Sequence, residues 1–137
     1  MVWKKIILVW LAFIPIAILN GIIRKNVYQT WLGELRSHQL STLIACLLFI
    51  ILAKIVIRDL TQTNKQNLIK IGLTWVLLTI FFEFGFGHFV AGHSWEHLLA
   101  DYNIFHGRIW SLFLVNELFT PFLLKFFNKN NSHHLSE

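Results

Sequence analysis

Apolar residues in this chain gather into long continuous runs instead of recurring at the helical spacing of a soluble core. Each run is close to the roughly 20 residues that a helix needs to cross the hydrocarbon region of a bilayer. The runs cover residues 6–23, 40–57, 68–90 and 109–127. They do not alternate with a period of two, so they predict helices and not barrel strands. The sequence therefore predicts an all-α polytopic membrane protein with four transmembrane helices.

Two of the connections between these runs carry apolar residues at helical spacing. In the first, Val27, Trp31 and Leu35 recur every four residues, as in a helix that lies in the membrane interface. In the connection between runs three and four, Ser94 suits an N-cap, and Glu96 follows in the first turn, where a negative charge favours the helix dipole. We therefore expect two short outer interfacial helices.

Composition agrees with this membrane assignment. The 137 residues are 55% hydrophobic and 14% charged, whereas a soluble domain is roughly 45–50% apolar and about 25% charged. The length allows one small domain, which we place at residues 1–127. The polar residues 128–137 are predicted to form a flexible cytoplasmic tail.

The positions of the positive charges predict which side of the membrane each end of the helices lies on. A net charge of +5 would suggest nucleic acid as a partner of a soluble protein, but these cations lie at the ends of the runs, so membrane lipids are the expected partners instead. If the N-terminus is inside, eight cations are cytoplasmic and four are outside, which predicts a multi-pass membrane protein with both termini in the cytoplasm. The cytoplasmic set is Lys4, Lys5, Lys54, Arg58, Lys65, Lys70, Lys125 and Lys129, and the outer set is Arg24, Lys25, Arg36 and Arg108.

Two carboxylates interrupt the apolar runs. Glu83 lies near the outer end of the third run, and Glu117 lies near the middle of the fourth, one turn before Pro121. An ionised carboxylate within a span costs several kcal/mol unless it is paired, hydrated or protonated. The two residues therefore either form a proton or cation pathway, or make hydrogen bonds between helices with groups such as Asn20.

Histidines near the second outer connection allow a metal site. His93 and His97 are one helical turn apart, and Asp101 follows one turn later, so three groups could bind zinc, copper or nickel. His88 and His106 could add ligands. The alternative is that these histidines lie in the interface without a ligand, in which case the protein has no cofactor.

The second outer connection also carries a distinctive motif. Its residues are Glu83, Gly87, Ser94-Trp95, Asp101-Tyr102-Asn103 and Gly107-Arg108. This motif resembles that of a family of small bacterial four-span membrane proteins. The resemblance implies four spans in a bacterial inner membrane and no particular activity, and the histidines do not belong to the motif.

Polar side chains of this segment predict a network at the outer end of the helices. Asp101, Tyr102, Asn103 and Arg108 are rich in hydrogen-bonding groups and adjoin the ends of runs three and four. Arg108 is long enough to form an ion pair with Glu83. Such a network, with Asn20, either closes the bundle or binds a small polar ligand or a lipid head group.

Three classes of function fit these features. The first is an accessory or ligand-binding membrane module, alone, as a homo-oligomer or with a larger membrane protein. The second is a small oligomeric transporter or channel for a cation or polar solute. The third is a membrane enzyme that uses Asp101, Glu96 or a histidine on a lipid head group. No nucleophile elbow, phosphate loop or HExxH motif occurs, so the sequence favours a role without catalysis.

Overall fold

The computed structural model describes residues 2–57, 60, 63–100 and 110–134, and this part of the chain contains helices and no strand. Four helical stretches are long and apolar enough to cross a membrane: Trp3–Leu32, Glu34–Val56, Lys65–Phe89 and Trp110–Asn130. The four predicted helices are therefore confirmed. The elements are α1 (Val2–Ile23), η1 (Arg24–Tyr28), α2 (Gln29–Leu32), α3 (Glu34–Val56), α4 (Lys65–Phe89), α5 (Trp95–Ala100) and α6 (Trp110–His134).

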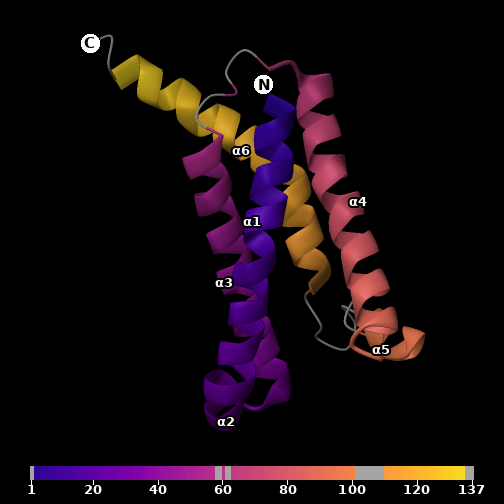
Figure 1. Cartoon of the computed structure of the whole chain (residues 1–137). Helices are drawn as coiled ribbons and strands as arrows, with labels where there is room; N and C mark the ends of the chain where they lie inside the picture. Colours follow the sequence, from indigo (N-terminus) through magenta and orange to yellow (C-terminus); the bar gives the residue numbers. More distant parts are fainter. Residues whose placement is uncertain (1, 58–59, 61–62, 101–109, 135–137) are drawn as a thin grey trace.

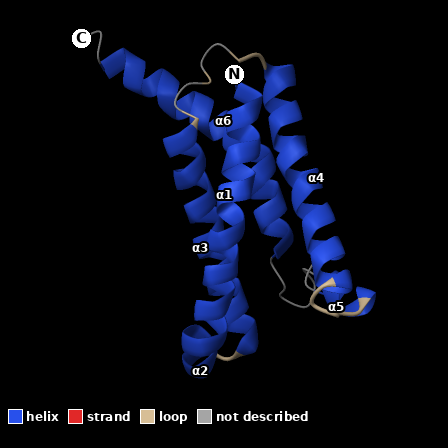
Figure 2. Ribbon diagram, viewed as in Figure 1, coloured by secondary structure: helices blue, strands red, loops and turns tan. Residues whose placement is uncertain are grey.

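The long helices form an up-and-down bundle. Helix α1 begins and helix α6 ends at one end of it, and the short helices α2 and α5 lie at the other, which we name the α5 end (Figure 1). Helix α6 packs against α3 and α4, and α1 packs against the same two helices. Figure 2 shows that the described loops before α3 and after α4 lie at the α5 end.

The first connection differs from the prediction. Helix α1 continues through the π-helical turn η1 into α2, and the chain breaks only at Gly33, whose φ of 83° lies in the left-handed region that favours glycine. Val27 and Trp31 thus prolong the first long helix, whereas Leu35 belongs to α3. The prediction of one interfacial helix carrying all three residues is wrong, because a spacing of four does not reveal a glycine break between them.

The second connection begins as the sequence predicts. Helix α5 starts at Trp95, the hydroxyl of Ser94 accepts a hydrogen bond from the His97 N–H at 3.1 Å, and Glu96 lies in the first turn. The side chain of Leu98 packs on Gly87 of α4, where an added Cβ would lie 2.7 Å from Leu98 Cδ2. This close approach holds α5 against the end of α4.

Helix α6 extends into the predicted C-terminal tail, because it runs to His134 and includes residues 128–134. The flexibility of the tail stays a prediction. Pro121 lies inside this helix and removes one backbone donor, and the helix changes direction along its length (Figure 1).

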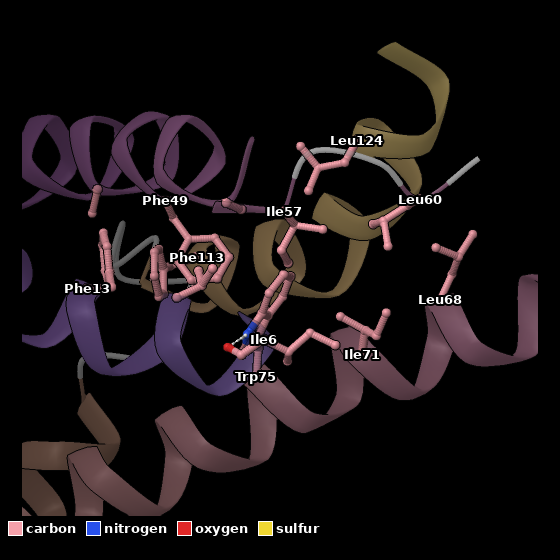
Figure 3. Packing of buried hydrophobic residues seen from close by; sticks show 13 residues of the cluster. Ile6, Phe13, Phe49, Ile57, Leu60, Leu68, Ile71, Trp75, Phe113 and Leu124 are labelled. Carbon is pink, nitrogen blue, oxygen red and sulfur yellow. Dashed lines mark hydrogen bonds between the residues drawn. The ribbon is translucent and has the colours of Figure 1, made fainter. Parts of the chain in front are cut away.

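An aromatic core fills the middle of the bundle (Figure 3). The ring of Phe49 lies edge-on to those of Trp75, Phe13 and Phe113, at centroid distances of 5.0, 5.2 and 5.7 Å. The indole N–H of Trp75 donates to the carbonyl of Ile6 at 2.9 Å. These contacts join all four long helices, and the exposed faces of the same helices carry leucine and isoleucine, as lipid contact requires.

Candidate functional site

An apolar cavity of about 350 Å³ lies at the α5 end, between helices α1, α4 and α6. Its wall is mostly aliphatic and aromatic, with a few polar side chains. The lining residues are Ile14, Ala17, Ile18, Arg24, His38, Phe82, Glu83, Phe84, Phe86, Gly87, Ala91, His93, Leu98 and Trp110. Ligand sites in proteins have this composition, in which an apolar wall provides affinity and a few polar groups fix orientation.

A second, polar cavity of about 430 Å³ adjoins the first. It is lined by Arg24, Lys25, Gln29, Glu34, Ser37, His38, His93, His97 and Leu98. Four residues line both cavities, namely Arg24, His38, His93 and Leu98. The α5 end therefore contains an apolar space and a polar space that share a wall.

The π-helical turn builds one side of the polar cavity. The N–H of Gln29 donates to the carbonyl of Arg24, five residues earlier, where an α-helix would bond residues four apart. The extra residue changes which side chains share a face, and Arg24, Lys25 and Gln29 all line the cavity. Single π turns of this kind are frequent at functional sites.

Glu83 lies in the wall of the apolar cavity, where it is partly buried. Its Oε1 accepts a hydrogen bond from the indole N–H of Trp110 at 2.6 Å, which links α4 to the first residue of α6. The Trp110 ring stacks on Phe113 at 4.8 Å and lies edge-on to His38 at 6.4 Å. This short hydrogen bond fixes the carboxyl group at the entrance to the aromatic core.

Glu117 and Asn20 are each buried, but at different places. Glu117 Oε2 accepts from the Thr79 hydroxyl at 2.9 Å, and that hydroxyl accepts from the Trp10 indole N–H at 3.2 Å, so the chain of bonds joins α1, α4 and α6. Asn20 donates instead to the carbonyl of Ser41 at 2.9 Å and joins α1 to α3. Neither lines either cavity, so both hold the bundle together.

The histidines pair in two ways. His93 and His97 stack with their ring centroids 4.7 Å apart, and both line the polar cavity. His88 stacks on Trp95 at 3.8 Å, and its Nδ1 donates to the carbonyl of His93 at 2.9 Å, so it braces the start of α5. Within residues 2–57, 63–100 and 110–134, no three histidine, cysteine, aspartate or glutamate side chains come together as a metal site would require.

Several predicted site residues lie outside the described part of the chain. They are Asp101, Tyr102, Asn103, His106 and Arg108. The outer network, the Glu83–Arg108 ion pair and the metal site that includes Asp101 and His106 therefore stay predictions.

Four of the charged and histidine residues that line the polar cavity were absent from the predicted site, namely Arg24, Lys25, Glu34 and His38. The sequence carries a signal for the side of the cavity that α3 forms, because Glu34, Ser37 and His38 share one helical face just ahead of an apolar run. From the sequence, Arg24 and Lys25 are interpreted as charges at the end of the first span. Their position in the cavity wall depends on the π turn, which the sequence does not predict.

Comparison with protein-family models, with curated proteins and with solved structures finds no match for this chain. The resemblance to small bacterial four-span proteins therefore gains no further support, and the function has to be argued from the cavities themselves.

Proposed function

We propose that this protein is a four-span membrane protein that binds an amphipathic molecule at the α5 end. The hydrocarbon part of the ligand occupies the apolar cavity, and its head group occupies the polar cavity. One observation carries the proposal: the two cavities share Arg24, His38, His93 and Leu98. A ligand with one apolar and one polar part matches such a pair, whereas a polar solute would leave the apolar wall without contacts.

The size of the cavities supports a ligand of this kind. Each cavity lies within the range of roughly 300–1,000 Å³ that is usual for small-molecule sites. Ile14, Ala17 and Ile18 of α1 and Phe82 and Phe86 of α4 supply apolar surface for a hydrocarbon chain. Because the cavity lies beside helices that are themselves apolar enough to cross a membrane, a lipid can reach it from the bilayer.

The distribution of charge supports a membrane orientation for the proposal. Among the described residues, seven lysines lie at the end opposite to α5, and three cations lie at the α5 end. We therefore place both termini in the cytoplasm of a bacterium and the ligand site at the outer face of the inner membrane. Trp31 and Trp95, which are 85% and 47% exposed, are suited to the membrane–water interface on that side.

Blocking the apolar cavity tests the proposal. The full chain is purified in mild detergent, and bound amphiphiles are identified by native mass spectrometry and lipid extraction. Ala17→Trp fills the cavity and should abolish retention of the amphiphile, whereas Leu47→Trp, at a position 60% exposed on the face of α3, should leave it unchanged. The proposal fails if the unmodified protein retains no amphiphile and binds none that is added, or if Ala17→Trp retains as much as Leu47→Trp.

A further inference from the structure

The side chains that line the polar cavity indicate which class of head group the amphipathic ligand carries. This inference rests on the function proposed above. We infer that the head group is anionic and carries a phosphate, which is held by Arg24 and Lys25 on the π turn and by the imidazoles of His93 and His97 on the facing segment. The ligand is thus a phosphate-bearing lipid, with its hydrocarbon chain in the apolar cavity.

Positive charge and hydrogen-bond donors dominate the polar cavity. Arg24 and Lys25 are cationic, and Glu34 is the one carboxylate among its described lining residues. Arginine presents five N–H donors in a fixed fork, so contacts with the protein still leave donors for a ligand, and lysine adds a compact charge with three more. This pair of residue types suits phosphate oxygens.

The two sides of the cavity come from separate elements. Arg24 and Lys25 belong to the π turn that follows α1, while His93 and His97 belong to the segment that is held on α4. The histidine rings lie 4.7 Å apart, close enough for both to reach one head group. A phosphate between the two sides would therefore bridge α5 to the first long helix.

The dimensions favour a phosphate over a fatty-acid carboxylate. The polar cavity, at about 430 Å³, is larger than the apolar one, at about 350 Å³. A carboxylate has only two oxygens, fewer acceptors than the arginine, lysine and imidazole groups of this cavity can donate to. A phosphate ester with its glycerol or sugar fills more of the space and offers more acceptors.

Lipids with the same tails and different head groups test the inference. Dioleoyl phosphatidic acid, dioleoylglycerol and oleate are titrated separately onto the full chain in detergent, and binding is followed by native mass spectrometry. We expect phosphatidic acid to bind at least about tenfold more tightly than dioleoylglycerol, since hydrogen bonds to charged groups contribute on this scale. The double variant Arg24→Gln/Lys25→Gln should lose this preference.

Matched variants distinguish the effect of charge at the site from the effect of the protein's net charge. Lys65→Gln/Lys70→Gln removes two charges at the opposite end and should keep the preference, and Arg24→Lys/Lys25→Arg should keep it as well. Equal binding of dioleoylglycerol and phosphatidic acid would overturn the inference but leave the proposed function intact. Oleate binding as tight as that of phosphatidic acid would overturn the phosphate assignment. Absence of binding by every lipid would overturn the proposed function itself.

Discussion

The middle of the bundle and its α5 end are built from the same helices but differ in packing. Side chains fill the middle, whereas the α5 end contains cavities. In the middle, Trp75, Phe49 and Glu117 are completely buried, and α4 approaches α6 closely at Gly72. At the α5 end, the same helices leave two cavities, and charged residues face them. Glu117 in the middle is bonded to Thr79 of a neighbouring helix, whereas Arg24 and Lys25 at the α5 end line a cavity. A polar residue in an apolar helix is therefore not by itself a sign of function.

The largest effect on stability should come from adding a side chain at the close contact between α4 and α6. An added Cβ at Gly72 would lie 2.5 Å from the carbonyl oxygen of Leu118, and neither backbone can move without separating the helices. We expect Gly72→Ala to lower the free energy of unfolding in detergent by at least about 2–3 kcal/mol. Gly85→Ala, in the same helix with nothing near its Cβ, should be neutral or stabilising by up to about 1 kcal/mol. Equal effects of the two substitutions would show that the middle is not closely packed.

The next effect concerns the buried bond between α4 and α6. Thr79→Val removes the hydroxyl that donates to Glu117, and it should lower the free energy of unfolding by roughly 1–2 kcal/mol because a buried acceptor loses its donor. In a double-mutant cycle, Thr79→Val with Glu117→Leu should cost less than the sum of the single changes. Strictly additive losses would mean that the two side chains do not interact.

A smaller effect is expected at the border between the two regions. Trp110→Phe keeps the ring stack on Phe113 but removes the indole donor to Glu83, so the free energy of unfolding should fall by about 1 kcal/mol. Trp3→Phe is the control, since Trp3 is 47% exposed at the opposite end. If the thermal midpoints of both variants match that of the parent protein, the bond to Glu83 contributes nothing to stability.

The smallest effect on stability should come from the charges of the polar cavity. Lys25 is exposed, so Lys25→Gln should change the free energy of unfolding by less than about 0.5 kcal/mol. The same substitution should weaken binding of phosphatidic acid. A large loss of stability, measured by thermal unfolding without lipid, would indicate that Lys25 supports the fold instead of the ligand site.

The four long helices could be predicted because an apolar run of about 20 residues has few other stable arrangements. The start of α5 was also predictable, since the Ser94 cap acts locally. The ends of the helices were less predictable. Helix α4 begins at Lys65, three residues before the predicted run, because the side chain of Asn64 caps it. The site was only partly predicted, as Glu83 and His93 line the cavities while Glu117 and Asn20 do not.

The missed part of the site depends on tertiary structure. The π turn brings Arg24 and Lys25 into the cavity wall, and no residue pattern from Arg24 to Tyr28 marks it. Thr79, the hydrogen-bond partner of Glu117, lies 38 positions away in the sequence, so the structural role of Glu117 also depends on how the helices pack. Sequence reasoning can find such polar residues but cannot assign each one to a core or to a cavity.

Photo-crosslinking tests the central claim, that an amphipathic ligand places its hydrocarbon chain inside the α5 end. Phosphatidic acid with a diazirine in its acyl chain is added below stoichiometry to the detergent-purified protein, illuminated, and mapped by peptide mass spectrometry. The account predicts labels at cavity residues such as Ile14, Ala17 and Phe82, and their loss when excess unlabelled phosphatidic acid is present. Labels spread over outward-facing residues such as Leu47, Ile55 and Leu77, without competition, would contradict it.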